Sequence, residues 1–254
     1  MFKPTSTALT LVFVMALAGC SSGDADNNAT ALTARNQSNG GAQPGSGGGS
    51  TLKSSASDIP ATTKSLLAAA EPFEALTETA FSSNKSQRTK AIEAAADAVR
   101  SVQGLVPQSV MTELNRNMAA ISAADIADHP ADIALASIEN YRVLVTAVPG
   151  SPVVPIDVSL LDYAGFRFDA DAQANPARWD DMGRALVFAR QHWSSVATQA
   201  AVAKAAPRFE AALTAMEQAI HDKNTVHARA VAKTELDLVD VLEAAFEHAG
   251  HSKA

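Results

Sequence analysis

The six histidines are the side chains of this chain best suited to hold a metal ion or haem. His221 and His227 flank a predicted turn, and His248 and His251 lie three residues apart near the C-terminus. The first pair has no evident third ligand. Glu247 would share a helix face with His251 if the helix continued that far, but Gly250 argues that it does not. A metal or haem carrier is therefore the alternative interpretation. The competing interpretation is that all four are ordinary polar residues at a turn and at the end of the chain.

Motifs that would name a reaction are absent from the sequence after residue 20. It contains no Glu-x-x-His, His-Glu-x-x-His or Gly-x-Ser-x-Gly pattern, no phosphate loop and no dinucleotide fingerprint. A single cysteine, Cys20, excludes the two-cysteine attachment of c-type haem. We therefore predict a protein that is not an enzyme and has no resident cofactor.

Aromatic residues gather in one part of the chain. Seven of the eleven that follow residue 20 lie between Tyr141 and Trp193. Aromatic walls with a few polar groups are typical of small-molecule pockets, and an acidic or amphipathic molecule would suit this set. The competing interpretation is that an alanine-rich bundle needs large side chains to fill its centre. The candidate ligand-binding residues are Tyr141, Asp162, Tyr163, Phe166, Arg167, Trp179 and Trp193.

The charge pattern limits the choice of partners. A formal net charge of −7 argues against nucleic acid. Near the C-terminus, Lys233, Asp237, Asp240 and Glu247 recur at helical intervals. This spacing is typical of a solvated helix face, and the alternative is a contact for a basic partner.

The first residues have the layout of a secretory signal peptide. Lys3 precedes an apolar run over residues 8–17, which is too short to span a bilayer, and the small residues Ala18 and Gly19 follow it. Cys20 comes next and is the only cysteine, so it can form no intramolecular disulfide. A lone exported thiol would be a liability unless it were modified. The alternative is a plain secreted protein with an incidental cysteine.

The run Leu17-Ala18-Gly19-Cys20 resembles the lipobox of bacterial lipoproteins, and the resemblance covers residues 1–20 only. It implies cleavage after a signal peptide of residues 1–19, a thioether-linked diacylglycerol on Cys20, and acylation of the new amino terminus, for instance by palmitate. Several acyl chains give stable attachment to a lipid bilayer. By analogy with enterobacterial sorting, Ser21 favours the outer membrane, where we expect the protein on the periplasmic face.

Residues 20–57 are predicted to be a flexible tether that begins at the lipidated cysteine. Ser, Gly, Asn, Asp, Ala and Thr dominate the segment, with few large apolar residues to bury. As a flexible coil it would span a root-mean-square distance of roughly 30 to 40 Å. We favour a spacer that clears the membrane surface; the alternative is a leash that lets the folded part search for partners.

Residues 58–248 are predicted to form one all-α domain, an up-and-down bundle of about six to seven helices, with 249–254 frayed after it. We expect Pro72 to kink or divide the first helical segment, and a short helix around 160–168. Asn175-Pro176 is expected to cap and start a long helix that continues to about 206. Two similar halves, about 86–148 and 176–247, explain the pattern as well as a single bundle with one long crossover.

The sequence therefore predicts a non-enzymatic binding module in the periplasm. Its partner is either an unknown periplasmic protein or a small ligand, in addition to the bilayer that would hold acylated Cys20. The predicted binding region is the aromatic-rich stretch between residues 141 and 193.

Overall fold

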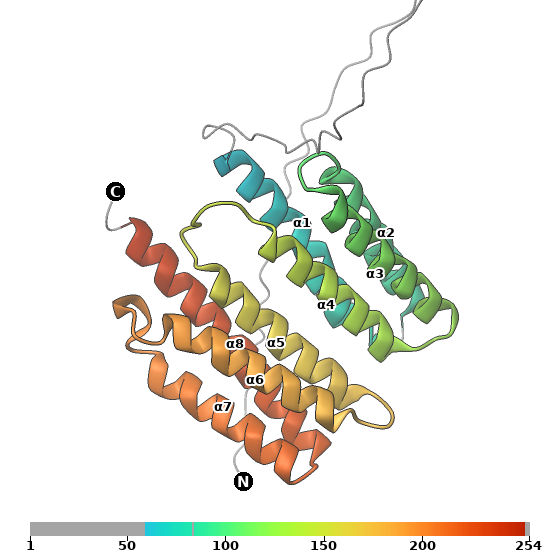
Figure 1. Ribbon diagram of the computed structural model, residues 1–254. Helices are drawn as coiled ribbons and strands as arrows, with labels where there is room; N and C mark the ends of the chain where they lie inside the picture. The colour runs from blue at the N-terminus through green and yellow to red at the C-terminus, as the bar shows by residue number, and fades with distance from the viewer. Residues whose placement is uncertain (1–58, 83, 252–254) are drawn as a thin grey trace, which may run out of the picture. The chain divides into compact units, whose positions relative to one another are not determined.

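The structure, a computed structural model, describes residues 59–82 and 84–251. The predicted signal peptide 1–19, Cys20 and the tether 20–57 lie outside the described residues. The described part contains eight α-helices, one short 3₁₀ helix and no strand, which confirms the predicted all-α bundle (Figure 1). In the same residues, no helix combines the length and the hydropathy that crossing a membrane requires.

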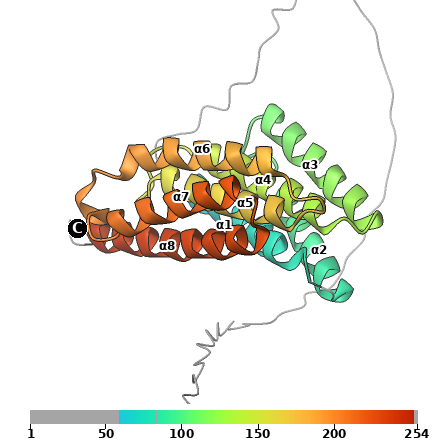
Figure 2. The ribbon, with the colours of Figure 1, turned by 90° about the horizontal axis from the view of Figure 1, so that it is seen from below.

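The helices form two four-helix units with the same connectivity. In each unit the first helix packs on the second and the fourth, and the third helix packs on both as well. Figure 2 shows the helices of the second unit lying side by side. The first unit comprises α1 (Ile59–Thr79), α2 (Lys85–Ser101), α3 (Gln108–Ile126) and α4 (Pro130–Thr146). The second comprises α5 (Ile156–Gln173), α6 (Trp179–Val196), the 3₁₀ helix (Ala200–Val202), α7 (Ala206–His221) and α8 (Thr225–His251).

The residue ranges predicted for the two halves therefore each omit the first helix of the observed unit. Each observed unit begins with a helix, α1 or α5, that the ranges 86–148 and 176–247 leave out. Both helices are unusual in sequence: α1 continues through Pro72, and α5 follows a proline-rich connection. The proline at position 72 therefore does not divide the first helical segment.

Helix α5 joins the two units because its apolar residues face both of them. Thirteen of its 18 residues are buried. Tyr163 and Phe166 belong to the core of the first unit, and Leu161 and Phe168 to the core of the second. A helix buried on opposite sides lacks the single apolar stripe by which amphipathic helices are detected, so its length was underestimated from the sequence.

Three helix ends differ from the predictions. Helix α6 begins at Trp179, not at Pro176, because the chain first turns at the end of α5, where the Arg178 N–H donates to the Asp171 carbonyl at 3.0 Å. It ends at Val196, and the 3₁₀ helix follows.

Helix α8 continues to His251, three residues beyond the predicted domain end. A Cβ atom at Gly250 would lie 2.6 Å from Val153 Cγ1, so this glycine lets the connection between α4 and α5 pack closely against the last turn. This contact between Gly250 and Val153 explains why α8 remains helical to His251, whereas the sequence predicted a frayed end from residue 249.

Candidate functional site

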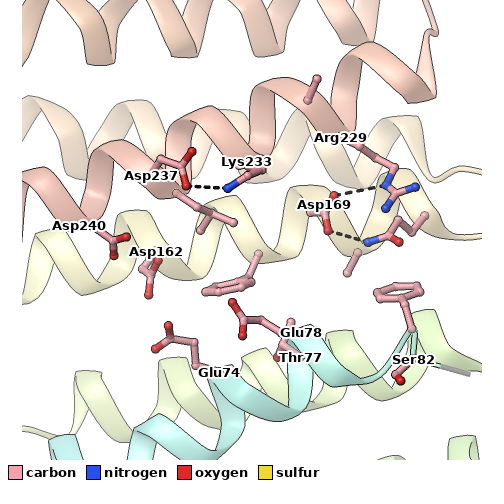
Figure 3. A pocket seen from close by; sticks show the side chains of 16 residues that line it. Glu74, Thr77, Glu78, Ser82, Asp162, Asp169, Arg229, Lys233, Asp237 and Asp240 are labelled. Carbon is pink, nitrogen blue, oxygen red and sulfur yellow. Dashed lines mark hydrogen bonds and ion pairs between the residues drawn. The ribbon is translucent and has the colours of Figure 1, made fainter. Parts of the chain in front are cut away.

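A groove with a volume of about 690 Å³ lies between α1 and α8, and α5 forms its floor (Figure 3). Helix α8 packs extensively on α5, whereas α1 meets α5 only slightly and packs mainly on α4 and α2. Among the described residues α1 and α8 form no comparable packing contact with each other. The space between them is therefore open along α5.

Carboxylates enter the groove from all three helices. Glu74 and Glu78 are four residues apart on α1, and Asp237 and Asp240 are three apart on α8, so each pair shares one helix face. Asp162 rises from the floor between them (Figure 3). Apolar side chains complete the lining: Phe81, Phe166, Ala170, Ala230 and Leu236.

One end of the groove has its charges paired. Asp169 Oδ2 accepts a hydrogen bond from Gln173 Nε2 at 2.6 Å, and Asp169 Oδ1 lies 3.8 Å from Arg229 Nε. Near the middle, Lys233 Nζ lies 2.8 Å from Asp237 Oδ1. Both cations that line the groove are therefore already engaged by carboxylates.

The other end has no such pairing. In the part of the chain that the structure describes, Glu74, Glu78 and Asp240 take part in no hydrogen bond or ion pair. The nearby Glu243 of α8, which lies outside the lining, has no such partner there either. The four lining carboxylates Glu74, Glu78, Asp162 and Asp240 are called the acidic end below.

Asp162 is the most deeply placed carboxylate of the acidic end. It is only 8% exposed, and its Oδ2 lies 3.4 Å from Tyr141 Oη. That separation is longer than the 2.5 to 3.0 Å of an ordinary O–H···O bond. Within residues 59–82 and 84–251 it is the only hydrogen bond of this carboxylate. A buried carboxylate thus faces the groove without a partner at normal distance.

Burial and mutual repulsion raise the pKa values of Glu74, Asp162 and Glu243. Burial, with repulsion from Glu78 and Glu243, raises the pKa of Glu74 to about 7. Burial first, and then Asp240, raises the pKa of Glu243 to about 6. The pKa of Asp162 lies well above its ordinary value, because of burial and then repulsion from Glu74. Near neutral pH the acidic end therefore retains protons that a bound cation would displace.

A further buried acid lies beside the floor of the groove. Glu235 of α8 is fully buried, and neither of its carboxylate oxygens has a hydrogen-bond partner in the described residues. Burial raises its pKa well above the ordinary value. A Cβ atom on Gly165 of α5 would collide with Glu235 Oε2, so this glycine provides the space for the carboxyl group.

The structure separates the seven predicted ligand-binding residues. Asp162 and Phe166 line the groove, and Tyr141 contacts Asp162 from α4. Tyr163 and Arg167 belong to a different cluster, between α4, α5 and α6. We call it the junction network, and its members are Glu113, Glu139, Arg142, Tyr163, Arg167 and Asp181.

The junction network is internally paired. Tyr163 Oη donates to Glu139 Oε1 at 2.6 Å, and Arg167 Nη1 donates both to Tyr163 Oη, at 2.8 Å, and to Glu139. Arg142 Nε binds the other oxygen of Glu139 at 2.8 Å. Asp181 lies 3.8 Å from Arg167 Nη2. These contacts hold the two four-helix units together and leave no unbound carboxylate.

The two tryptophans lie elsewhere in the second unit. Trp193 is buried, stacks on Phe209 with ring centroids 4.5 Å apart, and donates its indole N–H to Glu210. Trp179 is partly buried and packs against the core of the second unit at the start of α6. The seven residues therefore do not surround one cavity.

The histidines considered as metal ligands lie at the ends of α7 and α8. His221 Nδ1 is 3.0 Å from Asp222 Oδ1, the backbone N–H of His227 donates to Asn224, and His251 Nδ1 donates to the carbonyl of Glu247. His248 lies in the last turn of α8. Among the described residues no group of three or more His, Cys, Asp or Glu side chains could hold a metal ion.

The sequence prediction missed the contribution of α1. Glu74 and Glu78 carried a usable signal, their four-residue spacing, but nothing in the sequence placed them opposite α8. Lys233, Asp237 and Asp240 were predicted to form a solvated face, with contact to a basic partner as the alternative. In the structure these three residues line the groove.

Comparison of the chain with protein-family models, with curated proteins and with solved structures finds no match. Its function must therefore be inferred from the groove and the side chains that line it.

Proposed function

We propose that this protein is a non-enzymatic binding module, anchored by lipid to the outer membrane, that takes its ligand into the groove between α1, α5 and α8. The observation that carries the proposal is Asp162, a buried carboxylate that faces an open groove without a partner at normal hydrogen-bond distance. Burying such a group in its charged form costs free energy unless a proton or a bound cation neutralises it. A cationic ligand would take the place of the proton.

The lining of the groove supports binding better than catalysis. Its two hydroxyl side chains are poorly placed as nucleophiles: Thr77 Oγ1 donates to the Phe73 carbonyl at 2.8 Å, and Ser82 Oγ contacts the exposed Gln87. Among the described residues, neither hydroxyl is hydrogen-bonded to a histidine or carboxylate base.

The lipid anchor is supported by the lipobox-like residues 17–20, and the outer membrane, as opposed to the inner one, by Ser21. Replacing Cys20 with serine tests this part of the proposal. We expect Cys20→Ser to abolish incorporation of labelled palmitate and to move the protein from the membrane to the soluble fraction. Labelling of the variant would contradict lipidation at this residue.

A thermal-shift screen of the mature protein in nonionic detergent, followed by tryptophan fluorescence, tests binding. We expect a ligand at about 100 times its Kd to stabilise the protein by about 2.7 kcal/mol. Asp162→Asn should abolish the shift, whereas Glu93→Gln on α2, which also removes one exposed negative charge, should leave it unchanged. Equal stabilisation of Asp162→Asn would place the binding site outside the groove.

A further inference from the structure

We propose that the groove binds an aliphatic amine that carries two or more ammonium groups. This inference deepens the proposed function and rests on it. The expected ligand is a small organic cation whose charges are separated by methylene segments.

The charge of the groove favours such a ligand. Its acidic end presents Glu74, Glu78, Asp162 and Asp240, with no cation bound to any of them in the described residues. The two cationic side chains of the lining lie toward the other end and near the middle, where Asp169 and Asp237 engage them. An incoming ammonium group would therefore find carboxylates that no protein cation occupies.

Asp162 is an independent indication of a ligand. An exposed group of acids on one helix face can remain solvated, but Asp162 is more than nine-tenths buried and faces the groove. Its one hydrogen bond, from Tyr141 at 3.4 Å, is too long to satisfy it. A primary ammonium group offers three donors and can bind several carboxylate oxygens at once.

The apolar part of the lining fits methylene segments. Phe166 and Ala170 of α5 and Leu236 of α8 line the same groove as the carboxylates. Alkyl carbons between two ammonium groups would cover this surface, and each buried methylene contributes about 0.8 kcal/mol. The cavity volume of about 690 Å³ lies within the range of small-molecule sites.

A metal ion is a poorer occupant of the same groove. No set of three or more carboxylates in the described residues is arranged to hold one. Ammonium groups joined by a flexible chain do not need their carboxylates to converge on one point. They can bind separately to the α1 wall and the α8 wall.

Proton release should accompany binding. The groups that interact electrostatically with the acidic end come from every helix around it: Glu71, Glu74 and Glu78 on α1, Tyr141 on α4, Asp162 on α5, and Lys233, Glu235, Asp240, Glu243 and Glu247 on α8. Burial, with repulsion between the carboxylates, raises the pKa values of Glu74, Asp162 and Glu243, so protons are held here near neutral pH. An ammonium ligand favours the charged forms of these acids and displaces protons.

Isothermal titration calorimetry of the mature protein in nonionic detergent tests the inference. We expect spermidine to bind with a micromolar Kd, and n-butylamine, which has one ammonium group, to bind at least tenfold more weakly. Asp162→Asn and Glu74→Gln should each weaken spermidine binding at least tenfold, with Glu93→Gln as the control that does not. Titrations in buffers of different ionisation enthalpy should show protons released.

Other outcomes would overturn the inference. Equal affinity for n-butylamine, or spermidine binding that Asp162→Asn and the more exposed Glu78→Gln leave intact, would indicate unspecific attraction to an acidic surface. If spermidine fails while another compound or a basic peptide gives a thermal shift that Asp162→Asn abolishes, the amine is wrong and the proposed binding function stands. If nothing shifts the melting temperature, the proposed function fails too.

Discussion

Helix α5 carries ionisable side chains on two faces, and these faces are neutralised in different ways. Toward α4 and α6, Arg167 and Tyr163 belong to the junction network, in which every carboxylate has an arginine or a hydroxyl group bound to it. Toward α1 and α8, Asp162 faces the acidic end of the groove. Within the described residues its one hydrogen bond there is the 3.4 Å contact from Tyr141, and Glu74, Glu78 and Asp240 take part in no hydrogen bond or ion pair. Neighbouring residues of one helix thus lie in opposite electrostatic environments.

The difference separates two uses of buried charge. A paired network is costly to break, because the loss of one member leaves buried charge without its full set of partners. A group of unpaired acids is unfavourable as it stands, and it gains stability when a proton or a cation binds. The junction network therefore holds the two units together, and the groove is the region available to a ligand.

Breaking the junction network should give the largest effect on stability. Replacing Arg167 with methionine leaves Tyr163 and Glu139 without their shared donor in a partly buried site. We expect the free energy of unfolding to fall by about 2 to 3 kcal/mol. Urea denaturation measures this change. Asp162→Asn on the other face should cause no loss at pH 8, so equal destabilisation by both changes would contradict the distinction between the two faces.

Raising the pH should destabilise the protein through the unpaired acids. The pKa of Glu74 is about 7 in the folded protein and near 4.5 when unfolded, so its contribution to stability is complete below pH 4.5 and is lost as pH rises through 7. Asp171, beside Asp181 at the end of α5, has a pKa of about 7 for the same main reason, burial. We expect a melting temperature roughly 5 °C lower at pH 8 than at pH 5.

Glu74→Gln provides the control for this pH dependence. The variant removes one of the raised pKa values, so its melting temperature should vary less between pH 5 and pH 8 than that of the unchanged protein. Glu93→Gln, an exposed residue of α2 that does not line the groove, should retain the full dependence. A melting temperature that rises between pH 5 and pH 8 in the unchanged protein would show that these acids do not titrate as described.

Much of the fold could be predicted because helix signals are local. Gly104, Pro107 and Pro130 separate the helices of the first unit close to their observed ends. The length of helix α5 could not be predicted in this way. Its burial on both sides depends on how the two four-helix units pack, which local sequence signals do not indicate. The start of α6 also depends on the conformation of the loop after α5, where the Arg178 N–H donates to the Asp171 carbonyl seven residues earlier.

The candidate site was only partly predictable for a related reason. Asp162 and Phe166 stood out in the aromatic-rich stretch, but their neighbours Tyr163 and Arg167 point to another face of the same helix. Glu74 lies 88 residues before Asp162 in the sequence, and only the packing of α1 and α8 around α5 brings their carboxylates together. Because these charges come from three helices that are distant in the sequence, no local sequence pattern indicates that they lie together.

The smallest expected effect concerns the one lysine of the groove. Lys233 and its partner Asp237 are both largely exposed, with side-chain exposures of 76% and 61%, so their ion pair should contribute less than about 0.5 kcal/mol to stability. Lys233→Met should therefore leave urea denaturation nearly unchanged. By removing the cation nearest to the acidic end, however, it should strengthen spermidine binding two- to fivefold in calorimetry at low salt, and 0.5 M NaCl should reduce that gain. Weaker spermidine binding by this variant would mean that Lys233 binds part of the ligand. That result would contradict an ammonium ligand, because Lys233 carries a charge of the same sign.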